Sequence, residues 1–133
     1  MELKVMERVK GVPKRFAPYV LYSLLVDGEE VGRLILRDGS DKECYYEGHI
    51  GYTIFEEYRG HHYAYEGCLL LREFIDRDHV LITTDPNNIP SQKTIQKLGC
   101  KYIETKEIPK DVRKFFTNEE RVKDIYIWNL KDD

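Results

Sequence analysis

The sequence lacks any apolar run long enough to cross a membrane. A membrane-spanning helix needs about 18 or more consecutive apolar residues, and no stretch of the 133-residue chain approaches that length. The opening residues, Met1-Glu2-Leu3-Lys4, do not have the pattern of a signal peptide. We therefore expect neither membrane insertion nor export, and we place the protein in the cytoplasm.

Cysteine is scarce, and positive charge is not in excess. Cys44, Cys68 and Cys100 are an odd number, with no CxxC pair and no Cys/His metal spacing, so we expect reduced thiols. The adjacent His61 and His62 lack a third ligand at a recognisable spacing, so we expect no metal site. There are 21 Lys plus Arg against 24 Asp plus Glu, a net charge of −3. This balance argues against a nucleic-acid partner, because such proteins usually carry a basic surface.

Repeats, linkers and low-complexity segments are absent as well. The chain is 41% hydrophobic and 34% charged, a composition typical of folded proteins. At this length we predict one domain, residues 1–133, with a single sizeable core.

The first half of the chain predicts antiparallel strands. Residues 19–26 and 31–37 are rich in β-formers and flank Asp27-Gly28, and Asp-Gly between such runs is a strong hairpin signal. A second turn at 38–41 leads into a strand over 49–55. Residues 1–18 are less informative, because their apolar positions fit either a short helix or an edge strand.

The second half alternates helices and strands. Ala64, Cys68, Leu71 and Ile75 form one stripe of a helix predicted over 63–76. The β-branched run 79–84 predicts a buried strand parallel to 49–55. A second helix is predicted between Asn88 as N-cap and a terminal glycine at 99, followed by strands over 102–108 and 124–130. The connection 109–120 has room for a helical turn.

The turn between the strand 49–55 and the helix that follows it has the features of a phosphate-binding loop. Its sequence is Tyr58-Arg59-Gly60-His61-His62. The first amides of a helix have no internal acceptor and carry the positive end of the helix dipole, and Gly60 lets an anion approach the backbone. An ordinary strand–helix turn is the alternative, because glycine is common there too.

Two segments together resemble the GNAT superfamily of N-acetyltransferases. YRGHHYAYEGCLLL (58–71) is similar to its acyl-CoA pyrophosphate loop and helix, and NNIPSQKTIQKLGC (87–100) is similar to its second motif. The resemblance covers roughly residues 19–130. It implies an α/β (α+β) fold: a mixed, mostly antiparallel sheet that is splayed between two central parallel strands, with helices on both faces. Only 18 residues precede the first clear strand, where the family usually has a strand and two helices, so we expect a shortened N-terminal helical region.

The resemblance implies acetyl-CoA as co-substrate and an amine as acceptor, and a homodimer is compatible with it. The backbone of Tyr52, Thr53 and Ile54 is implied to pair with the pantetheine arm. Asn88 is implied to bind the pantetheine amides, and Ser91 to lie near the thioester. The residues implied to hold the pyrophosphate are Arg59, Gly60, His61, His62, Tyr63 and Ala64. For Asn88 and Ser91 the alternative is plain helix capping.

Four positions depart from the family pattern. Glu57 and His62 stand in the loop where Gln or Arg and a second glycine are usual. We expect anion binding to persist if the φ angle of His62 is negative. Ile95 replaces a tyrosine that acts as general acid in many members, and Cys100 replaces a phenylalanine.

The predicted reaction is direct transfer of an acetyl group to an amine of a small molecule, peptide or protein. The attacking amine must lose a proton. Glu47 and His49 are the candidates for this role, and Ser91 is a third catalytic candidate. A solvated glutamate and a packing histidine are the alternatives for the first two. A non-catalytic acyl-CoA-binding module is the second hypothesis, and a general nucleotide- or phosphate-binding domain is the third.

Overall fold

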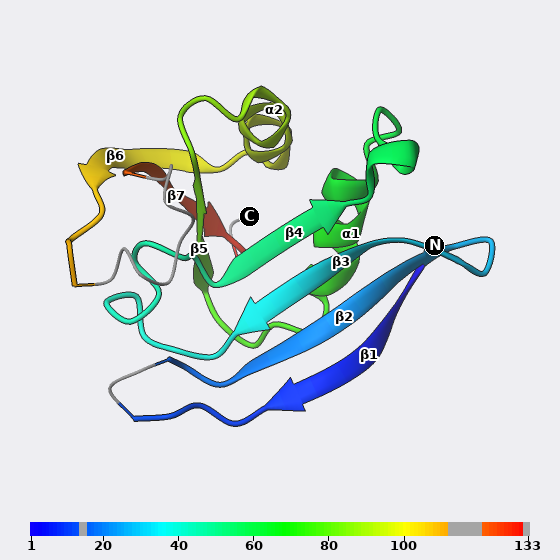
Figure 1. Cartoon of the computed structure of the whole chain (residues 1–133), viewed down its shortest axis with the longest axis horizontal. Helices are drawn as coiled ribbons and strands as arrows, with labels where there is room; N and C mark the ends of the chain where they lie inside the picture. The colour runs from blue at the N-terminus through cyan, green and yellow to red at the C-terminus, as the bar shows by residue number, and fades with distance from the viewer. Residues whose placement is uncertain (14–15, 112–120, 132–133) are drawn as a thin grey trace.

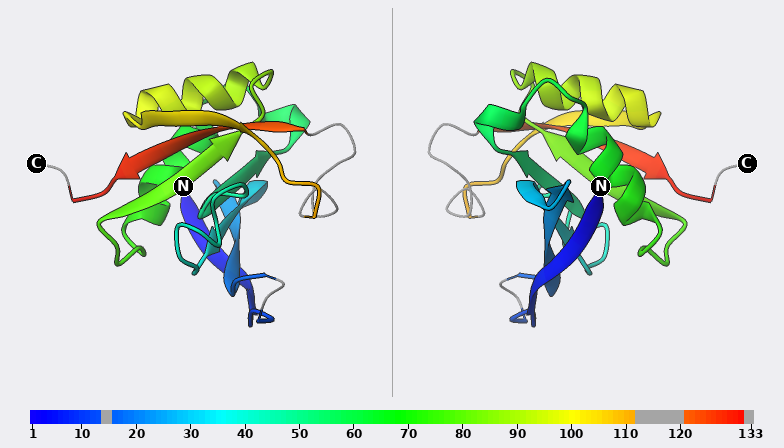
Figure 2. Two further views of the ribbon diagram at one scale, coloured as in Figure 1. Left: turned by 90° about the vertical axis from the view of Figure 1, so that its left-hand side faces the viewer. Right: turned by 90° about the vertical axis from the view of Figure 1, so that its right-hand side faces the viewer.

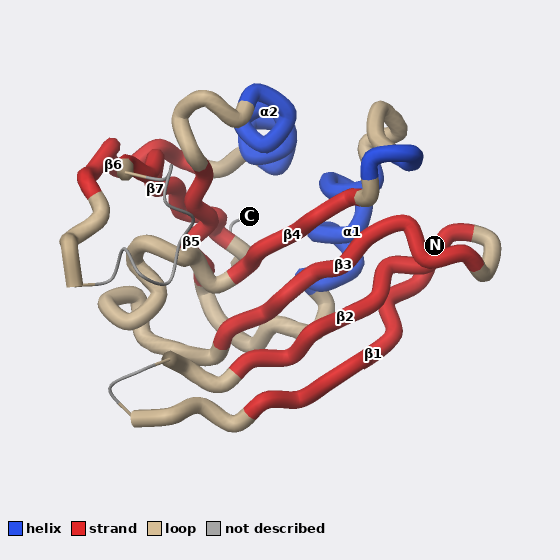
Figure 3. Tube along the Cα trace, in the orientation of Figure 1, coloured by secondary structure: helices blue, strands red, loops and turns tan. Residues whose placement is uncertain are grey.

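The protein is described by a computed structural model covering residues 1–13, 16–111 and 121–131 (Figure 1). These residues form a seven-stranded mixed sheet with strand order β1-β2-β3-β4-β5-β7-β6, one 3-10 turn and two α-helices (Figure 3). The elements are β1 (Glu2–Val9), β2 (Tyr19–Val26), β3 (Glu29–Arg37), β4 (Ile50–Ile54), η1 (Glu56–Tyr58), α1 (Tyr63–Arg72), β5 (His79–Thr84), α2 (Ile89–Leu98), β6 (Lys101–Glu107) and β7 (Val122–Asn129).

Strands β1 to β4 form an antiparallel meander. Asp27 and Gly28 have φ angles of 52° and 83°, which are the positive values that a tight two-residue hairpin turn needs, so the predicted hairpin is confirmed. The uncertain N-terminal segment proves to be edge strand β1, paired with β2. The strand predicted over 49–55 is confirmed as β4. It is one residue shorter than predicted at each end, and the turns at 41–47 that precede it bury Cys44.

Strands β4 and β5 are the parallel pair among the described strands, as predicted, and they separate almost at once. The ladder between them consists of one pair, Ile50 with Ile82. Next to it, the amide of His49 donates to the carbonyl of Leu81 over 2.8 Å. Beyond this point the two strands diverge toward their C-terminal ends and leave an open wedge.

Both helices pack on the same face of the sheet. A Cβ on Gly67 of α1 would lie 3.2 Å from Leu24 and from Leu34, and Ile95 of α2 is fully buried in the same hydrophobic core. The crossovers β4-α1-β5 and β5-α2-β6 advance in the same direction through the sheet, and right-handed crossovers in one direction put their helices on one face. The expectation of helices on both faces is therefore wrong for the described residues.

The opposite face is covered near β5 by the segment 40–48, where Thr83 Oγ1 donates to the carbonyl of Tyr46 over 2.8 Å. The sheet also twists strongly, so that β7 runs across the direction of β1 and β2 (Figure 2).

The C-terminal strands follow the prediction closely. Strand β7 lies between β5 and β6 and is therefore an internal strand. Helix α1 ends at Arg72, four residues before its predicted end. Most of the connection 109–120 lies outside the described residues. Neither described helix is long and apolar enough to span a bilayer.

Candidate ligand-binding site

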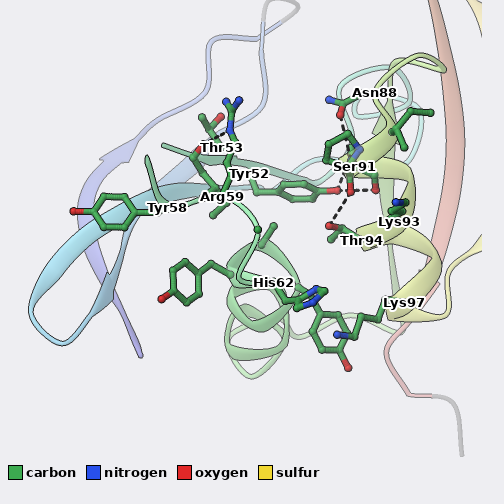
Figure 4. Close-up of a pocket in the computed structure, with 17 residues that line it drawn as sticks. Tyr52, Thr53, Tyr58, Arg59, His62, Asn88, Ser91, Lys93, Thr94 and Lys97 are labelled. Carbon is green, nitrogen blue, oxygen red and sulfur yellow. Dashed lines mark hydrogen bonds between the residues drawn. The ribbon is translucent and has the colours of Figure 1, made fainter. Parts of the chain in front are cut away.

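A cavity of about 630 Å³ occupies the open end of the β4–β5 wedge (Figure 4). Its walls come from the C-terminal half of β4, the turn into α1, the first turn of α1, and α2. The residues that line it are Tyr52, Thr53, Ile54, Tyr58, Arg59, Gly60, His62, Tyr63, Ala64, Tyr65, Asn88, Ile89, Pro90, Ser91, Lys93, Thr94 and Lys97. The cavity thus joins both segments that the sequence singled out.

The charges around this cavity are sorted by sign. The lining residues include Arg59, Lys93 and Lys97, together with His62, but no aspartate or glutamate. The chain as a whole has a net charge of −3, so this one-sided lining is not a consequence of the overall composition. A cleft lined by one sign of charge concentrates ligands of the opposite sign, and the cavity is therefore suited to an anion.

The turn into α1 has two residues with positive φ angles. Gly60 has φ = 91°, and His62, the N-cap of α1, has φ = 62° and ψ = 24°. The condition set for His62, a negative φ angle, is thus not met. A left-handed residue that precedes a helical one turns successive N–H groups toward a common point, which makes an anion-binding concavity. No atom lies within 4 Å of the place where a Cβ on Gly60 would be, so the loop is open on that side.

The backbone of β4 offers unpaired groups to the wedge. The amide of Phe55 donates to the carbonyl of Val31, and the carbonyl of His49 accepts from Arg37. Because bonding alternates along an antiparallel strand, the odd-numbered residues of β4 face β3 and the even-numbered ones face the wedge. The polar backbone groups of Tyr52 and Ile54 therefore point where β5 has already moved away. The carbonyl of Ile54 accepts from Arg59 Nε over 3.1 Å, whereas the carbonyl of Tyr52 and the amides of both residues face no strand there and can pair with a ligand.

The first turn of α2 presents polar side chains to the cavity. Asn88 is the N-cap, as predicted, and its Oδ1 accepts from the amide of Ser91 over 3.2 Å. The hydroxyl of Tyr52 reaches from β4 across the wedge and lies 2.8 Å from Ser91 Oγ (Figure 4). Burial raises the pKa of Tyr52 well above the ordinary value of a phenol. Ile95 is fully buried in the core and does not line the cavity.

Glu47 and His49 do not line the cavity. Glu47 Oε2 is 3.1 Å from Arg37 Nε. His49 is completely buried, and burial lowers its pKa. Its Nδ1 accepts from the amide of Leu81 over 2.9 Å, so the ring proton is on Nε2, which lies 2.9 Å from the carbonyl of Gly39. These contacts favour a structural role for both residues, and their catalytic role stays a prediction.

The sequence assigns ten of the lining residues to the ligand site. It places Tyr58 in the loop without a role, and it leaves Lys93 and Lys97 open between a place near the adenosine phosphate and a solvated helix face. His61 was expected with its loop neighbours, but it is not among the lining residues and its ring lies 5.3 Å from that of Tyr63. Tyr65 was not expected; it follows the loop on α1, and Lys97 Nζ lies 4.4 Å from its ring centroid. The bond between Tyr52 and Ser91 was also missed, because no local pattern relates residues 39 positions apart.

Comparison with known proteins identifies the family. Residues 6–101 match the Acetyltransferase (GNAT) domain family, and the chain belongs to that family. A comparison with curated proteins found no match.

Solved structures of low sequence identity have the same fold. Mycobacterium smegmatis RimJ in complex with CoA-disulfide is 17% identical with a TM-score of 0.65, over 84% of this chain and 53% of that one. The apo form of RimL, a ribosomal L7/L12 alpha-N-protein acetyltransferase, is 14% identical with a TM-score of 0.66, over 86% and 72%. The microcin C7 self-immunity acetyltransferase MccE, in complex with acetyl-CoA and AMP, is 13% identical with a TM-score of 0.66, over 84% and 61%. This chain thus spans less than two thirds of the RimJ and MccE chains.

Proposed function

We propose that the protein is an acetyl-CoA-dependent N-acetyltransferase that moves an acetyl group directly to an amine within a ternary complex. The observation that carries the proposal is the cavity in the β4–β5 wedge, whose lining combines unpaired backbone groups with three cations and no carboxylate. Acetyl-CoA has the matching chemistry, because it carries phosphates at one end and an amide-bearing arm that leads to the thioester.

In this proposal the two parts of the cavity bind the two parts of the ligand. The backbone amides of Gly60 to Ala64 hold the pyrophosphate, including that of His61, whose side chain lies outside the lining, while the amide of Arg59 donates to the carbonyl of Glu56 over 3.3 Å. The backbone of Tyr52 to Ile54 pairs with the pantetheine arm as an added strand would. Asn88 and Ser91 contact the arm and the thioester from the other wall.

The chemical step needs little from a general acid. The amine nitrogen attacks the thioester carbonyl carbon, a backbone N–H of β4 stabilises the oxyanion, and the C–S bond breaks with its electron pair on sulfur. A thiol with a pKa near 8.5 leaves readily as the thiolate. The amine must lose its proton, and we assign that proton to water, because Glu47 is paired with Arg37 and His49 is buried.

The acceptor in this proposal is a small-molecule amine or the amino group of a peptide or protein. RimL, which shares the fold, is a ribosomal L7/L12 alpha-N-protein acetyltransferase. Its activity supports the inclusion of N-terminal peptides among the acceptors tested.

The test has two parts. Calorimetry with CoA and with ATP measures binding, and release of free thiol from acetyl-CoA measures turnover against polyamines, amino sugars, amino acids and N-terminal peptides. We expect micromolar binding of CoA, weaker binding of ATP, and turnover with at least one acceptor class. Equal binding of ATP and CoA would indicate a general nucleotide site instead.

A non-catalytic acyl-CoA-binding module is the second candidate. The specific observation in its favour is that no carboxylate is found among the described residues that line the cavity, where His62 contributes the one imidazole. CoA binding without thiol release across the whole acceptor panel would favour this candidate over the enzyme.

A further inference from the structure

One side chain crosses the wedge and joins its two walls. The Tyr52 hydroxyl starts on β4 and ends 2.8 Å from Ser91 Oγ and 3.5 Å from the Ser91 carbonyl oxygen on α2 (Figure 4). The far end of this contact is held firmly. Asn88 caps the helix through the amide of Ser91, and the next residue, Gln92, bonds both Asp124 and Tyr126 of β7 over 2.7 Å. These bonds hold the first turn of α2, and the backbone of Ser91 with it, against β7.

The direction of the Tyr52–Ser91 bond follows from the acceptors within reach. If Ser91 donated to Tyr52, the phenol proton would be left with the Ser91 carbonyl at 3.5 Å, which is too long for a good bond. If Tyr52 donates to Ser91 Oγ, the phenol proton has a good acceptor, and the hydroxyl proton of Ser91 remains available for another bond. A phenol is also the stronger acid and hence the better donor. We therefore assign the donor role to Tyr52, which leaves the Ser91 proton available to a third atom in the wedge.

The donor role of Tyr52 persists across the range in which an amine acceptor loses its proton. Burial raises the pKa of this phenol above its ordinary value of about 10, so that Tyr52 keeps its proton in alkaline solution. The position on α2 where the family often has a tyrosine holds Ile95, which is fully buried in the core. The phenol that reaches Ser91 comes instead from the opposite wall, on Tyr52 of β4.

We propose that Tyr52 is a positioning residue for acetyl transfer: it holds Ser91 Oγ so that the serine proton points at the sulfur of the departing thiolate. This inference rests on the proposed function. As the C–S bond breaks, the electron pair stays on sulfur, Ser91 donates a hydrogen bond to that charge, and no proton leaves the protein. Hydrogen bonds to charged acceptors are about twice as strong as neutral ones, so the bond strengthens as the charge develops. Solvent then protonates the released thiolate.

The experiment compares Tyr52→Phe, Ser91→Ala and the double variant by thiol release from acetyl-CoA, with CoA binding measured by calorimetry. We expect each single variant to lower kcat by about fivefold to tenfold, the loss of one hydrogen bond to a developing charge. KM for acetyl-CoA and the Kd of CoA should stay within about twofold. Because Tyr52 acts through Ser91, adding Tyr52→Phe to Ser91→Ala should cause no further loss.

Tyr45→Phe is the matched control. It removes a phenol hydroxyl that also bonds a neighbouring element, at Glu104 of β6, but Tyr45 does not line the cavity. We expect its kcat to equal that of the natural chain.

Three results would overturn the inference. The first is full kcat in Tyr52→Phe. The second is the same loss of kcat when Tyr52→Phe is introduced into the natural chain and into Ser91→Ala, and the third is a rise in KM with kcat unchanged. Each of these presupposes an active natural chain. A natural chain that binds CoA but acetylates no amine would instead refute the proposed function, and the role of Tyr52 with it.

Discussion

At the scale of single residues, the loop before α1 contains a strained position. His62 has a left-handed conformation that most L-residues avoid at a cost of about 1–2 kcal/mol. Glycine is usual at this position in the family that the sequence resembles, and glycine adopts this conformation freely. The imidazole of His62 is directed across the cavity toward Lys97 (Figure 4). The strained residue therefore adds a further nitrogen-bearing side chain to the proposed anion site.

We predict that His62→Gly raises the free energy of unfolding by about 0.5 kcal/mol. The left-handed strain is removed, and part of the gain is offset by the greater backbone entropy of glycine in the unfolded chain. Denaturant unfolding measures the change. His61→Gly is the matched control, because His61 is not among the residues with positive φ; it should lower stability by about 0.5–1 kcal/mol. A loss of stability in both variants would contradict the assignment of strain to His62.

A second prediction concerns Gly60. Gly60→Glu places a carboxylate where the pyrophosphate is proposed to bind, and we expect CoA affinity to fall ~100-fold or more through steric exclusion and charge repulsion. Calorimetry on folded protein measures the change. Gly60→Ala carries the same backbone penalty at φ = 91° without the charge, so it should lose far less affinity. Equal losses in the two variants would show that backbone strain, and not the anion site, is responsible.

At the scale of elements, the N-terminus of α2 serves both stability and the proposed ligand site. We predict that Asn88→Ala lowers the free energy of unfolding by about 1 kcal/mol through the lost cap. It should also weaken CoA binding more than binding of adenosine 3′,5′-bisphosphate, which lacks the pantetheine arm. Calorimetry with both ligands makes the comparison.

Asn87→Ala is the control for this helix end, because Asn87 neither caps α2 nor lines the cavity. We expect it to change neither quantity appreciably. Equal loss of affinity for the two ligands in Asn88→Ala would leave Asn88 as a cap alone.

The elements themselves were largely predictable, and the reasons are local. Period-two alternation around Tyr52 and the stripe of Cys68 and Leu71 reflect burial against one core, so the pattern identifies the element. Helix α1 ends early, because the amides after Arg72 bond carbonyls three residues back in the chain instead of four. This narrower turn brings the ring centroid of Phe74 to 6.0 Å from that of Tyr22. That contact joins residues far apart in sequence and leaves no periodic signal.

The residues of the candidate site were predictable only where their role depends on their neighbours in the sequence. The cap at Asn88 and the bare glycine at 60 are signals of this kind. The positive φ of His62 is not a signal of this kind, because a histidine in a loop does not by itself indicate a left-handed conformation. The contact between Tyr52 and Ser91 depends on the angle at which β4 and β5 separate, which is a property of the whole sheet.

At the scale of the whole molecule, His49 joins the elements at the closed end of the wedge. It is the residue before β4, and its ring bonds the amide of Leu81 in β5 and lies beside the carbonyl of Gly39. Arg77 Nη1 lies 2.6 Å from Nε2, and Asp41 Oδ1 lies 3.9 Å from it. Burial is the main cause of the lowered pKa of His49, and the Arg77 cation adds to it.

We predict that stability falls on mild acidification because of His49. Its pKa is lower in the folded state, so the unfolded chain binds the proton more tightly. The stability contribution is complete above the ordinary histidine pKa of about 6.5 and is lost as the pH falls from there toward the folded-state value. His49→Gln keeps one donor and one acceptor but does not titrate, so its Tm should change less between pH 7 and pH 5. His61→Gln, at an exposed site, should retain the slope of the natural chain.

The single pair that joins β4 to β5 means that the sheet has two interior edges facing each other. The strands β1–β4 and the strands β5, β7 and β6 are two separate ladders. They are connected through that one pair, through the bonds of His49 to Leu81, and through the packing of α1, α2 and the segment 40–48. A ligand that occupies the wedge would complete the hydrogen bonding between them and would itself become part of the sheet. The exchange of the Tyr52 and Ile54 amides with deuterated solvent should then slow when CoA is added, while the amides of Thr53 and Phe55, already bonded to β3, should respond much less. Ligand occupancy would in this way determine whether the two ladders open independently or as one cooperative unit.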